Sequence, residues 1–219
     1  MQQKTEMRSF MRSALRGFTL PHLEGLSEKA SAVLIGEAAF AEAGVVLSYC
    51  AMEREADPHI ATDFALRQKK KVALPRCVPG TGLMEFYTLS PDEPLSAQTK
   101  EGMWHIREPR QNPLRLFEPE TCMDGPVLAV VPGIAFGPGG ERLGRGRGYY
   151  DRYLARLRSA LSANGVALTV AGFCFPFQHG TPFCVQEHDE PVDAVVTACG
   201  FSWCRGGKQF MQSGSSTER

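Results

Sequence analysis

The sequence predicts a three-layer, Rossmann-like α/β fold, in which a mostly parallel sheet is flanked by helices on both faces. Three observations predict it. Short apolar, strand-like runs alternate along the chain with longer segments of helical periodicity. The run at residues 127–131 is apolar throughout, which is typical of a strand buried on both faces. A glycine-rich loop joins that run to an amphipathic helix, the kind of crossover that parallel strands require.

The elements follow from these patterns in chain order. Helical periodicity covers residues 4–17, 27–42, 58–69 and 149–163, and Asn164-Gly165 provides a stop signal for the last of these. Strand-like runs cover residues 45–49, 71–74, 84–89, 127–131, 168–173 and 194–197. Residues 90–125 are rich in Pro, Glu and Gln and predict an irregular excursion. Long loops of this kind in compact domains are often functional.

The length and composition favour one domain. A chain of 219 residues, 43% hydrophobic and 22% charged, is long enough for a substantial core and ordinary for a soluble protein. We expect a monomer with a single α/β domain over residues 1–205 and a flexible tail over 206–219, which is rich in Ser and Gly. No apolar run approaches the roughly 18–20 residues of a membrane span, so no membrane partner is expected.

The charge balance argues against a general nucleic-acid binder. Lysine plus arginine equals aspartate plus glutamate at 24 each, whereas such binders carry excess basic charge. Positive charge is concentrated instead at the N-terminus and in residues 142–158, as would suit a small polyanionic ligand. An RNA-associated protein that uses the arginines of this stretch is the alternative, although no RNA-binding module is present.

The cysteines indicate a reducing compartment. Seven of them make an odd count without a Cys-x-x-Cys pair, and the grouping of His179, Cys184 and His188 fits no usual zinc spacing. We interpret most of the cysteines as small buried hydrophobes and expect a cytoplasmic location.

The N-terminal segment carries Lys4, Arg8, Arg12 and Arg16, four residues apart. Each step of four drifts only about 40° around a helix, so the first three share one face. Arginine-rich starts with few acids also occur in organelle transit peptides. We interpret this one as a helix of the mature protein that presents a basic ridge, which can be functional or merely solvated.

The most informative segment is residues 131–151, where three arginines lie within a glycine loop that opens a helix. Gly144, Gly146 and Gly148 allow sharp turns and close approach of a ligand. A helix N-terminus offers unpaired N–H groups and partial positive charge. Guanidinium groups are suited to phosphate oxygens. Together these features predict an anion site at a strand-to-helix junction; its arginines are Arg142, Arg145 and Arg147.

This loop matches neither a Walker loop, because no Gly-Lys-Ser/Thr follows, nor a dinucleotide fingerprint, because the spacing differs. An exposed basic turn is the simpler interpretation of an isolated Arg-Gly-Arg-Gly. The adjoining Tyr149-Tyr150 and Asp151 disfavour it, because a solvated turn needs neither an aromatic pair nor an acid beside three arginines.

The string Pro132-Gly-Ile-Ala-Phe136, followed by Gly140-Glu-Arg-Leu-Gly-Arg-Gly-Arg-Gly-Tyr-Tyr-Asp-Arg-Tyr-Leu154, closely resembles the signature of the 5-formyltetrahydrofolate cyclo-ligase family. Other landmarks follow in the family's order. They include the Lys-x-x-x-Arg of residues 4–8, the Tyr-to-Pro segment 49–58, the Leu-Pro-Arg of 74–76, the Met-Glu-Phe of 84–86, the Trp-to-Pro segment 104–109 and the acidic segment 187–193. The resemblance spans residues 4 to 197 and implies a fold like that of the sugar-phosphate isomerase and CoA-transferase class.

The resemblance also implies the site residues. The nucleotide is expected at Lys4, Arg8, Arg142, Leu143, Gly144, Arg145, Gly146, Arg147, Gly148, Tyr149 and Tyr150. The folate is expected at Cys50, Glu55, Met84, Trp104 and the loop residues 145–149. Catalysis is assigned to Arg145, Arg147 and Tyr149, and magnesium to Asp151 and Asp189.

The residues by themselves leave these roles open. Asp151 can serve the helix dipole instead of a metal, and Glu187, Glu190 and Asp193 compete with Asp189. Tyr149, Met84 and Trp104 can be core residues, and Glu55 an ordinary exposed acid. Arg76 is equally compatible with a surface charge and with a contact to the folate tail.

The implied reaction converts ATP and 5-formyltetrahydrofolate into ADP, phosphate and 5,10-methenyltetrahydrofolate through a phosphorylated formyl group, with Mg²⁺ as cofactor. Two departures from the family pattern stand out. Gly137 occupies a place usually held by Asp, and Ala56 and Pro58 replace an aliphatic residue and a Thr. The alternative function is therefore a catalytically impaired paralogue that binds folate or nucleotide as a regulatory module.

Overall fold

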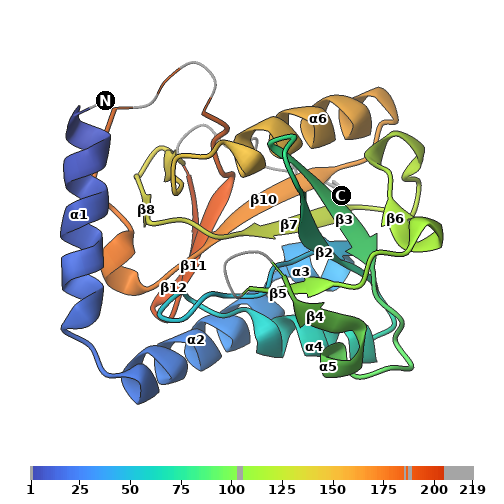
Figure 1. The fold of residues 1–219 in the computed structure, drawn as a ribbon, viewed down its shortest axis with the longest axis horizontal. Coiled ribbons are helices and arrows are strands. Elements are labelled where there is room, and N and C mark those ends of the chain that lie inside the picture. The colour runs from blue at the N-terminus through green and yellow to red at the C-terminus, as the bar shows by residue number, and fades with distance from the viewer. Residues whose placement is uncertain (1, 103–105, 185, 187–188, 205–219) are drawn as a thin grey trace, which may run out of the picture.

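A computed structural model describes residues 2–102, 106–184, 186 and 189–204. Their centre is an 8-stranded sheet in the order β12-β11-β10-β7-β1-β2-β3-β6 (Figure 1). The strands β11 (Ala194–Thr197), β10 (Leu168–Phe173), β7 (Val127–Val131), β1 (Val45–Leu47) and β2 (Lys71–Val78) are parallel neighbours. Antiparallel strands flank them: β12 (Gly200–Trp203), β3 (Leu83–Thr88) and β6 (Leu116–Phe117). The predicted mostly parallel sheet is confirmed.

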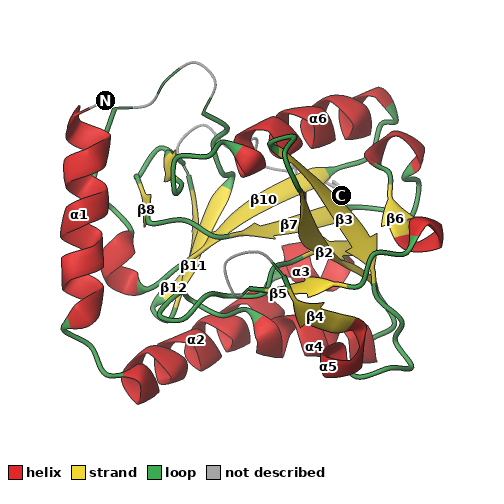
Figure 2. Ribbon diagram, in the orientation of Figure 1, coloured by secondary structure: helices red, strands yellow, loops and turns green. Residues whose placement is uncertain are grey.

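Helices cover both faces of this sheet (Figure 2). The helices α2 (Leu20–Ile35), α3 (Ala38–Glu42) and α4 (His59–Arg67) pack on one face, and α6 (Tyr149–Ala163) packs on the other. The strands β1, β7 and β11 therefore bury both of their side-chain rows along their whole length, as continuous apolar sequences predict. The three-layer architecture is confirmed.

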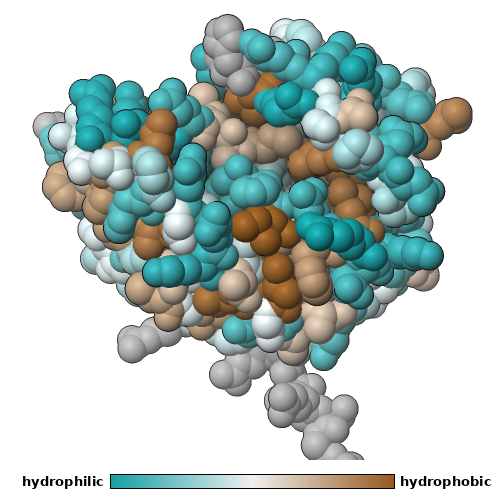
Figure 3. Space-filling view, turned by 90° about the horizontal axis from the view of Figure 1, so that it is seen from below, coloured by the Kyte–Doolittle hydropathy of each residue, from teal (hydrophilic) through white to brown (hydrophobic). Residues whose placement is uncertain are grey.

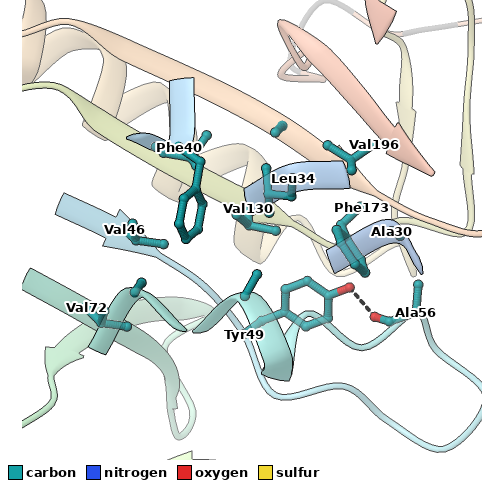
Figure 4. Packing of buried hydrophobic residues seen from close by; sticks show 14 of the residues in the cluster. Ala30, Leu34, Phe40, Val46, Tyr49, Ala56, Val72, Val130, Phe173 and Val196 are labelled. Carbon is teal, nitrogen blue, oxygen red and sulfur yellow. Dashed lines mark hydrogen bonds between the residues drawn. The ribbon is translucent and has the colours of Figure 1, made fainter. Parts of the chain in front are cut away.

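The larger apolar cluster lies between α2, α3, α4 and the sheet. Leu34, Phe40 and Phe173 are almost completely buried in it, as Figure 4 shows. Tyr49 lies at its edge and donates its hydroxyl hydrogen bond to the carbonyl of Ala56. Because the phenol is buried and its hydroxyl is hydrogen-bonded, the side chain of Tyr49 is held in place near the start of the loop that leaves β1.

Several element boundaries differ from the sequence prediction. The first helix, α1, spans Gln2–Arg16. The helix predicted at residues 27–42 is in fact two helices, α2 and α3. The first of them begins after Thr19, with Pro21 in its first turn, where proline needs no hydrogen-bond partner. It ends at Gly36, whose N–H bonds to carbonyls of the last turn.

The excursion at residues 90–125 is more regular than predicted. It contains α5 (Leu95–Gln98), a ribbon of β4 (Thr99–Glu101) and β5 (Arg107–Pro109), and two short helical turns, Pro113–Arg115 and Pro119–Thr121. The buried amide of Gln98 organises it: it accepts from Ser90 N at 2.6 Å and donates to Ser90 O and Glu93 O. Such a non-local bond leaves no trace in sequence periodicity. In addition, β2 extends four residues beyond its predicted end at residue 74.

The topology creates a crevice at the carboxyl ends of β1 and β7. These strands are neighbours, but α4 carries the chain from β1 to β2 on one face, while α6 carries it from β7 to β10 on the other. The loops that leave the two strands therefore diverge. Open α/β sheets bind ligands at such switch points.

The helix α1 stands apart from the two helical layers (Figure 1). It packs through Met11 and Met7 against Ala135, Leu143 and Phe183, in a small cluster beside the short hairpin of β8 (Ala135–Phe136) and β9 (Arg142–Leu143). No helix in the described part of the chain is both long and apolar enough to cross a bilayer. The face in Figure 3 carries hydrophobic side chains in separate groups among hydrophilic ones.

Candidate active site

A cavity of about 350 Å³ opens at the diverging loops. Its floor lies above the ends of β1 and β7. One wall is the arginine loop, residues 142–151, and the other comes from the loop after β1 and from β2, β3 and β5. The lining residues are Arg8, Tyr49, Cys50, Met52, Glu55, Pro75, Cys77, Met84, Ile106, Arg107, Glu108, Pro132, Gly133, Arg142, Gly144, Arg145, Gly146, Arg147, Gly148, Tyr149, Tyr150 and Asp151.

The arginine loop has the conformation that its glycines predict. Gly146 has φ 92° and Gly148, which immediately precedes α6, has φ 68°. Both angles are in the left-handed region that favours glycine. The loop and the start of α6 consequently line the pocket, and the N-terminus of a helix is a favourable place for an anion.

Arg8 brings α1 to this loop. Its Nε donates to Gly144 O at 2.9 Å, and its guanidinium lies beside Gly146. Arg8, a residue of the predicted basic ridge, therefore lines the cavity. Lys4 does not line it. It lies one turn further out, ion-paired with Asp189.

Three ion pairs join residues assigned to different ligands. Lys4 pairs with Asp189, Arg142 pairs with Asp151 at 2.5 Å, and Arg145 pairs with Glu55 at 3.3 Å. In each pair a cation expected to hold phosphate neutralises a carboxylate expected to hold metal or folate. Each of these three carboxylates therefore already has a cationic partner before any ligand binds.

Arg142 differs from the other two arginines of the loop. Its side chain is only 3% exposed, whereas that of Arg145 is 54% exposed. Its guanidinium bonds Asp151, lies over the ring of Tyr150 at 5.4 Å and leaves Nε without a hydrogen-bond partner. Arg142 thus supports the loop from beneath, while Arg145 and Arg147 are exposed on it.

Three further residues predicted to bind the nucleotide have different positions relative to the cavity. Leu143 is 1% exposed and packs on Met11 rather than lining the cavity. Tyr150 lines the cavity, and burial raises the pKa of its phenol well above the ordinary value. Tyr149 also lines it, with the guanidinium of Arg152 over its ring at 5.6 Å.

The opposite wall is largely apolar. Cys50 and Met84 lie there as predicted, and burial raises the pKa of the Cys50 thiol to about 11. Glu55, the acid that was predicted to contact the folate, also lies on this wall. Burial raises the pKa of its carboxyl, while Arg145 and the N–H of Met52 oppose the rise. Trp104 is outside the described residues.

Several pocket residues were missed by the sequence reasoning. Cys77 reaches the wall because β2 continues past its predicted end. Glu108 comes from β5 in the excursion; it is buried, and it accepts from Cys77 N at 3.2 Å. Arg76 pairs with Glu108 at 3.6 Å and donates to Pro109 O, so its contacts are to β5. The available signals were the family resemblance of residues 74–76 and 104–109 and the general observation that long loops carry function.

Arg152 is a further unpredicted residue. Its guanidinium donates to Gly82 O in the β2–β3 turn and to Arg147 O in the arginine loop. It therefore connects the two walls of the cavity. Its helical position in α6 gave no indication of this contact, because Gly82 is 70 residues away in sequence.

Gly137, which stands where the family usually has Asp, lies next to the carboxylate of Glu141. Glu141 folds back in the β8–β9 turn, and its Oε2 accepts from Gly139 N at 2.8 Å. A Cβ atom placed on Gly137 would lie 2.2 Å from the same oxygen. A carboxylate therefore occupies the space where a side chain at position 137 would begin.

The carboxylates suit magnesium by type. Asp151 and Asp189 offer the hard oxygen donors that Mg²⁺ prefers. Glu190 N lies 3.4 Å from Asp151 Oδ1, which places the segment of Asp189 beside Asp151. Among the described residues no three His, Cys, Asp or Glu side chains converge on one point. The donors fit an ion that takes one or two carboxylates and completes its shell with water and phosphate oxygens.

Comparisons with known proteins identify related chains. The 5-formyltetrahydrofolate cyclo-ligase family matches residues 1–198. A probable 5-formyltetrahydrofolate cyclo-ligase of Schizosaccharomyces pombe is 30% identical over 149 residues, covering 66% of this chain and 70% of the relative. The 5-formyltetrahydrofolate cyclo-ligase of Mus musculus is 29% identical over 148 residues, covering 68% and 70%. The solved structure of Aquifex aeolicus 5,10-methenyltetrahydrofolate synthetase superimposes with a TM-score of 0.72 at 26% identity, covering 97% of this chain and 98% of that one.

Proposed function

The chain belongs to the 5-formyltetrahydrofolate cyclo-ligase family, and from this premise we propose that it couples cleavage of ATP to ring closure of 5-formyltetrahydrofolate. The products are 5,10-methenyltetrahydrofolate, ADP and phosphate. The single observation that carries the proposal is the composition of one cavity, in which an arginine loop at a helix N-terminus faces a largely apolar wall with a partly buried carboxylate. Such a cavity suits a polyphosphate and a heterocycle side by side.

The chemistry proceeds in two steps. The formyl oxygen on N5 attacks the γ-phosphorus of ATP, the bond to the β-bridging oxygen breaks, and ADP leaves. N10 then attacks the activated formyl carbon and gives up its proton. The carbon–oxygen bond breaks as phosphate departs with its electron pair, which leaves the methenyl bridge. Phosphoryl transfer of this kind asks the protein for positioning and for charge neutralisation.

The loop supplies both. Arg145 and Arg147, together with the backbone N–H groups of residues 144–148, hold the terminal phosphate, and Tyr149 packs beside the reacting groups. Charge develops on the transferred phosphoryl oxygens, so fixed donors aimed at them lower the barrier. Arg8 closes over the loop from α1, and Lys4 joins it when its pair with Asp189 opens.

Arg142 contributes from beneath the loop. Because its side chain is almost fully buried against Asp151 and Tyr150, we assign it to hold these two residues in place rather than to reach phosphate directly. Asp151 and Asp189 are the proposed ligands of Mg²⁺, which when bound neutralises phosphate charge.

The folate lies against the opposite wall. Glu55 accepts N–H groups of the pterin, and Cys50, Met84 and Trp104 form the surrounding surface. Binding of pterin by Glu55 also releases Arg145 from its ion pair for the phosphate. We further propose that the protein works as a cytoplasmic monomer without a nucleic-acid or membrane partner, a location supported by its unpaired cysteines.

The test follows methenyltetrahydrofolate absorbance and ADP release when ATP is added to the protein with 5-formyltetrahydrofolate and magnesium. We expect both signals in a 1:1 ratio, and neither with a non-hydrolysable ATP analogue. Folded protein that binds both ligands without forming either product would contradict the proposal and favour the non-catalytic alternative. No structural observation favours that alternative, because Glu141 supplies a carboxylate beside Gly137.

A further inference from the structure

Arg54 has an unusual backbone conformation next to the site. Its φ is 61°, in the left-handed region, where a side chain other than glycine is strained. Strained residues persist only where the surroundings hold them, and they concentrate at functional sites. Arg54 directly precedes Glu55, the proposed pterin acceptor. The turn is closed on both sides, because Glu55 N donates to Met52 O and Met52 N donates to Glu55 Oε2.

The guanidinium of Arg54 explains what holds this conformation. It donates to Leu15 O at 3.1 Å and to Phe18 O at 2.9 Å. Leu15 lies in the last turn of α1 and Phe18 lies two residues beyond it, so the guanidinium sits at the C-terminal end of the helix, which carries partial negative charge. A cation at this position is stabilising, so the bonds offset the backbone strain.

These contacts place α1 in a closed circuit around the cavity. Near its middle, Arg8 bonds Gly144 of the arginine loop. At its C-terminal end, Arg54 bonds the last carbonyls and leads into Glu55. Glu55 in turn pairs with Arg145, the residue that follows Gly144. The helix thus contacts the arginine loop near its middle and the turn of Glu55 at its C-terminal end.

We propose that Arg54 is a positioning residue that ties the end of α1 to the turn of Glu55 and thereby couples nucleotide binding to folate binding. A nucleotide that holds Arg8 and the loop fixes α1, and α1 fixes Glu55 through Arg54. The pterin then binds a carboxylate already in place. By linkage, folate favours the nucleotide by the same factor. The identity of the two ligands rests on the proposed function.

The chain offers a matched control. Lys69 also has a left-handed backbone, with φ 57°, but it is exposed and does not line the cavity. R54G and K69G both relieve the strained angle, whereas only R54G removes a guanidinium from α1. R54K keeps the charge with a single donor group. Any effect that R54G shows and K69G lacks therefore belongs to the contact with α1.

The first readout needs no ligand. Hydrogen exchange on the free protein should show faster exchange in the last turn of α1 and in residues 52–55 for R54G, with little change for K69G. The second readout is the affinity for 5-formyltetrahydrofolate with and without a non-hydrolysable ATP analogue. We expect the analogue to tighten folate binding by at least about fivefold in the native protein. The ratio should fall toward one in R54G, remain in K69G and be intermediate in R54K.

Two results would overturn the proposal. One is unchanged exchange in R54G, which would mean that Arg54 does not hold α1. The other is an unchanged coupling ratio in R54G, or a ratio of one in the native protein. Failure of the proposed function is distinguishable, because it appears as absent turnover with binding and exchange still measurable.

Discussion

The two walls of the cavity are built in different ways. The phosphate wall is one continuous segment, residues 142–151, with Arg145 and Arg147 exposed. The pterin wall combines side chains from separate elements: Cys50 from the loop after β1, Cys77 from β2 and Met84 from β3. Water-exposed cations act through charge at the reacting atoms, whereas a buried wall acts through shape and protonation. Substitutions in the first wall should therefore change turnover, and those in the second should change folate affinity.

The largest effect is expected from Arg147→Ala. The guanidinium is exposed, so its removal costs little stability, yet in the proposed function it holds the phosphate whose charge changes during transfer. We expect kcat/KM to fall by about 10³-fold. The matched control is Arg156→Ala, an equally exposed arginine of α6 that bonds Glu120 and does not line the cavity. Similar rates in both variants would show that the phosphate wall does not act through Arg147.

Asp151→Asn should have the next largest effect. The amide keeps the size of the side chain but lacks the charge that pairs with buried Arg142 and suits Mg²⁺. We expect activity to fall by about 10²-fold and the magnesium requirement to rise. A thermal melt should show a moderate loss of stability, because Arg142 loses its charged partner. A normal magnesium titration curve would contradict the metal role and leave only the ion pair.

Glu55→Gln should distinguish the two walls, because it should change the KM for one substrate and not for the other. We expect the KM for 5-formyltetrahydrofolate to rise by about tenfold, with the KM for ATP nearly unchanged, because one charged hydrogen bond is replaced by a neutral one. Equal rises in both KM values would contradict a role confined to the pterin wall.

The same residue predicts a pH dependence. Burial raises the pKa of Glu55, so the folded protein holds this proton more tightly than the unfolded chain. The contribution of Glu55 to stability therefore decreases as pH rises from its ordinary pKa through the raised value. Glu55→Gln should gain stability relative to the native protein over that range, measured by urea unfolding. Folate KM of the native protein should rise as pH falls toward the raised pKa, and that of the variant should stay flat.

Cys77→Ser should have the smallest effect. The thiol lines the pterin wall, and its removal leaves the loop and its ion pairs intact. We expect a change of about two- to threefold in folate KM and none in kcat, measured by steady-state kinetics. A large fall in kcat would show that this wall contributes to chemistry as well as to binding.

The sequence predicted the two walls unequally, for the same reason that they differ. The phosphate wall is local, so glycines, arginines and a helix start in one string were enough to identify it. The pterin wall depends on where strands end and on which loops fold over them. Cys77 was missed because β2 is longer than its apolar run, and Glu108 because β5 lies in a segment without clear periodicity. The same applies to Arg152, whose contact spans 70 residues.

The fold itself was largely predictable. Buried parallel strands such as β7 and β10 are continuous apolar runs, and the α6 pattern with its Asn164-Gly165 stop gave correct bounds. One failure concerns a local cap, since the break at Gly36 is decided by a few hydrogen bonds. The roles of Leu143 and Arg142 could not be separated from those of their neighbours, because sequence does not show which side of a loop faces the ligand.

The most direct measurement is a crystal structure of the complex with magnesium, a non-hydrolysable ATP analogue and 5-formyltetrahydrofolate. We predict the terminal phosphate on residues 144–148 between Arg145 and Arg147, with the formyl oxygen against it and the pterin on Glu55. A nucleotide bound elsewhere, with the arginine loop in contact with solvent alone, would contradict the account.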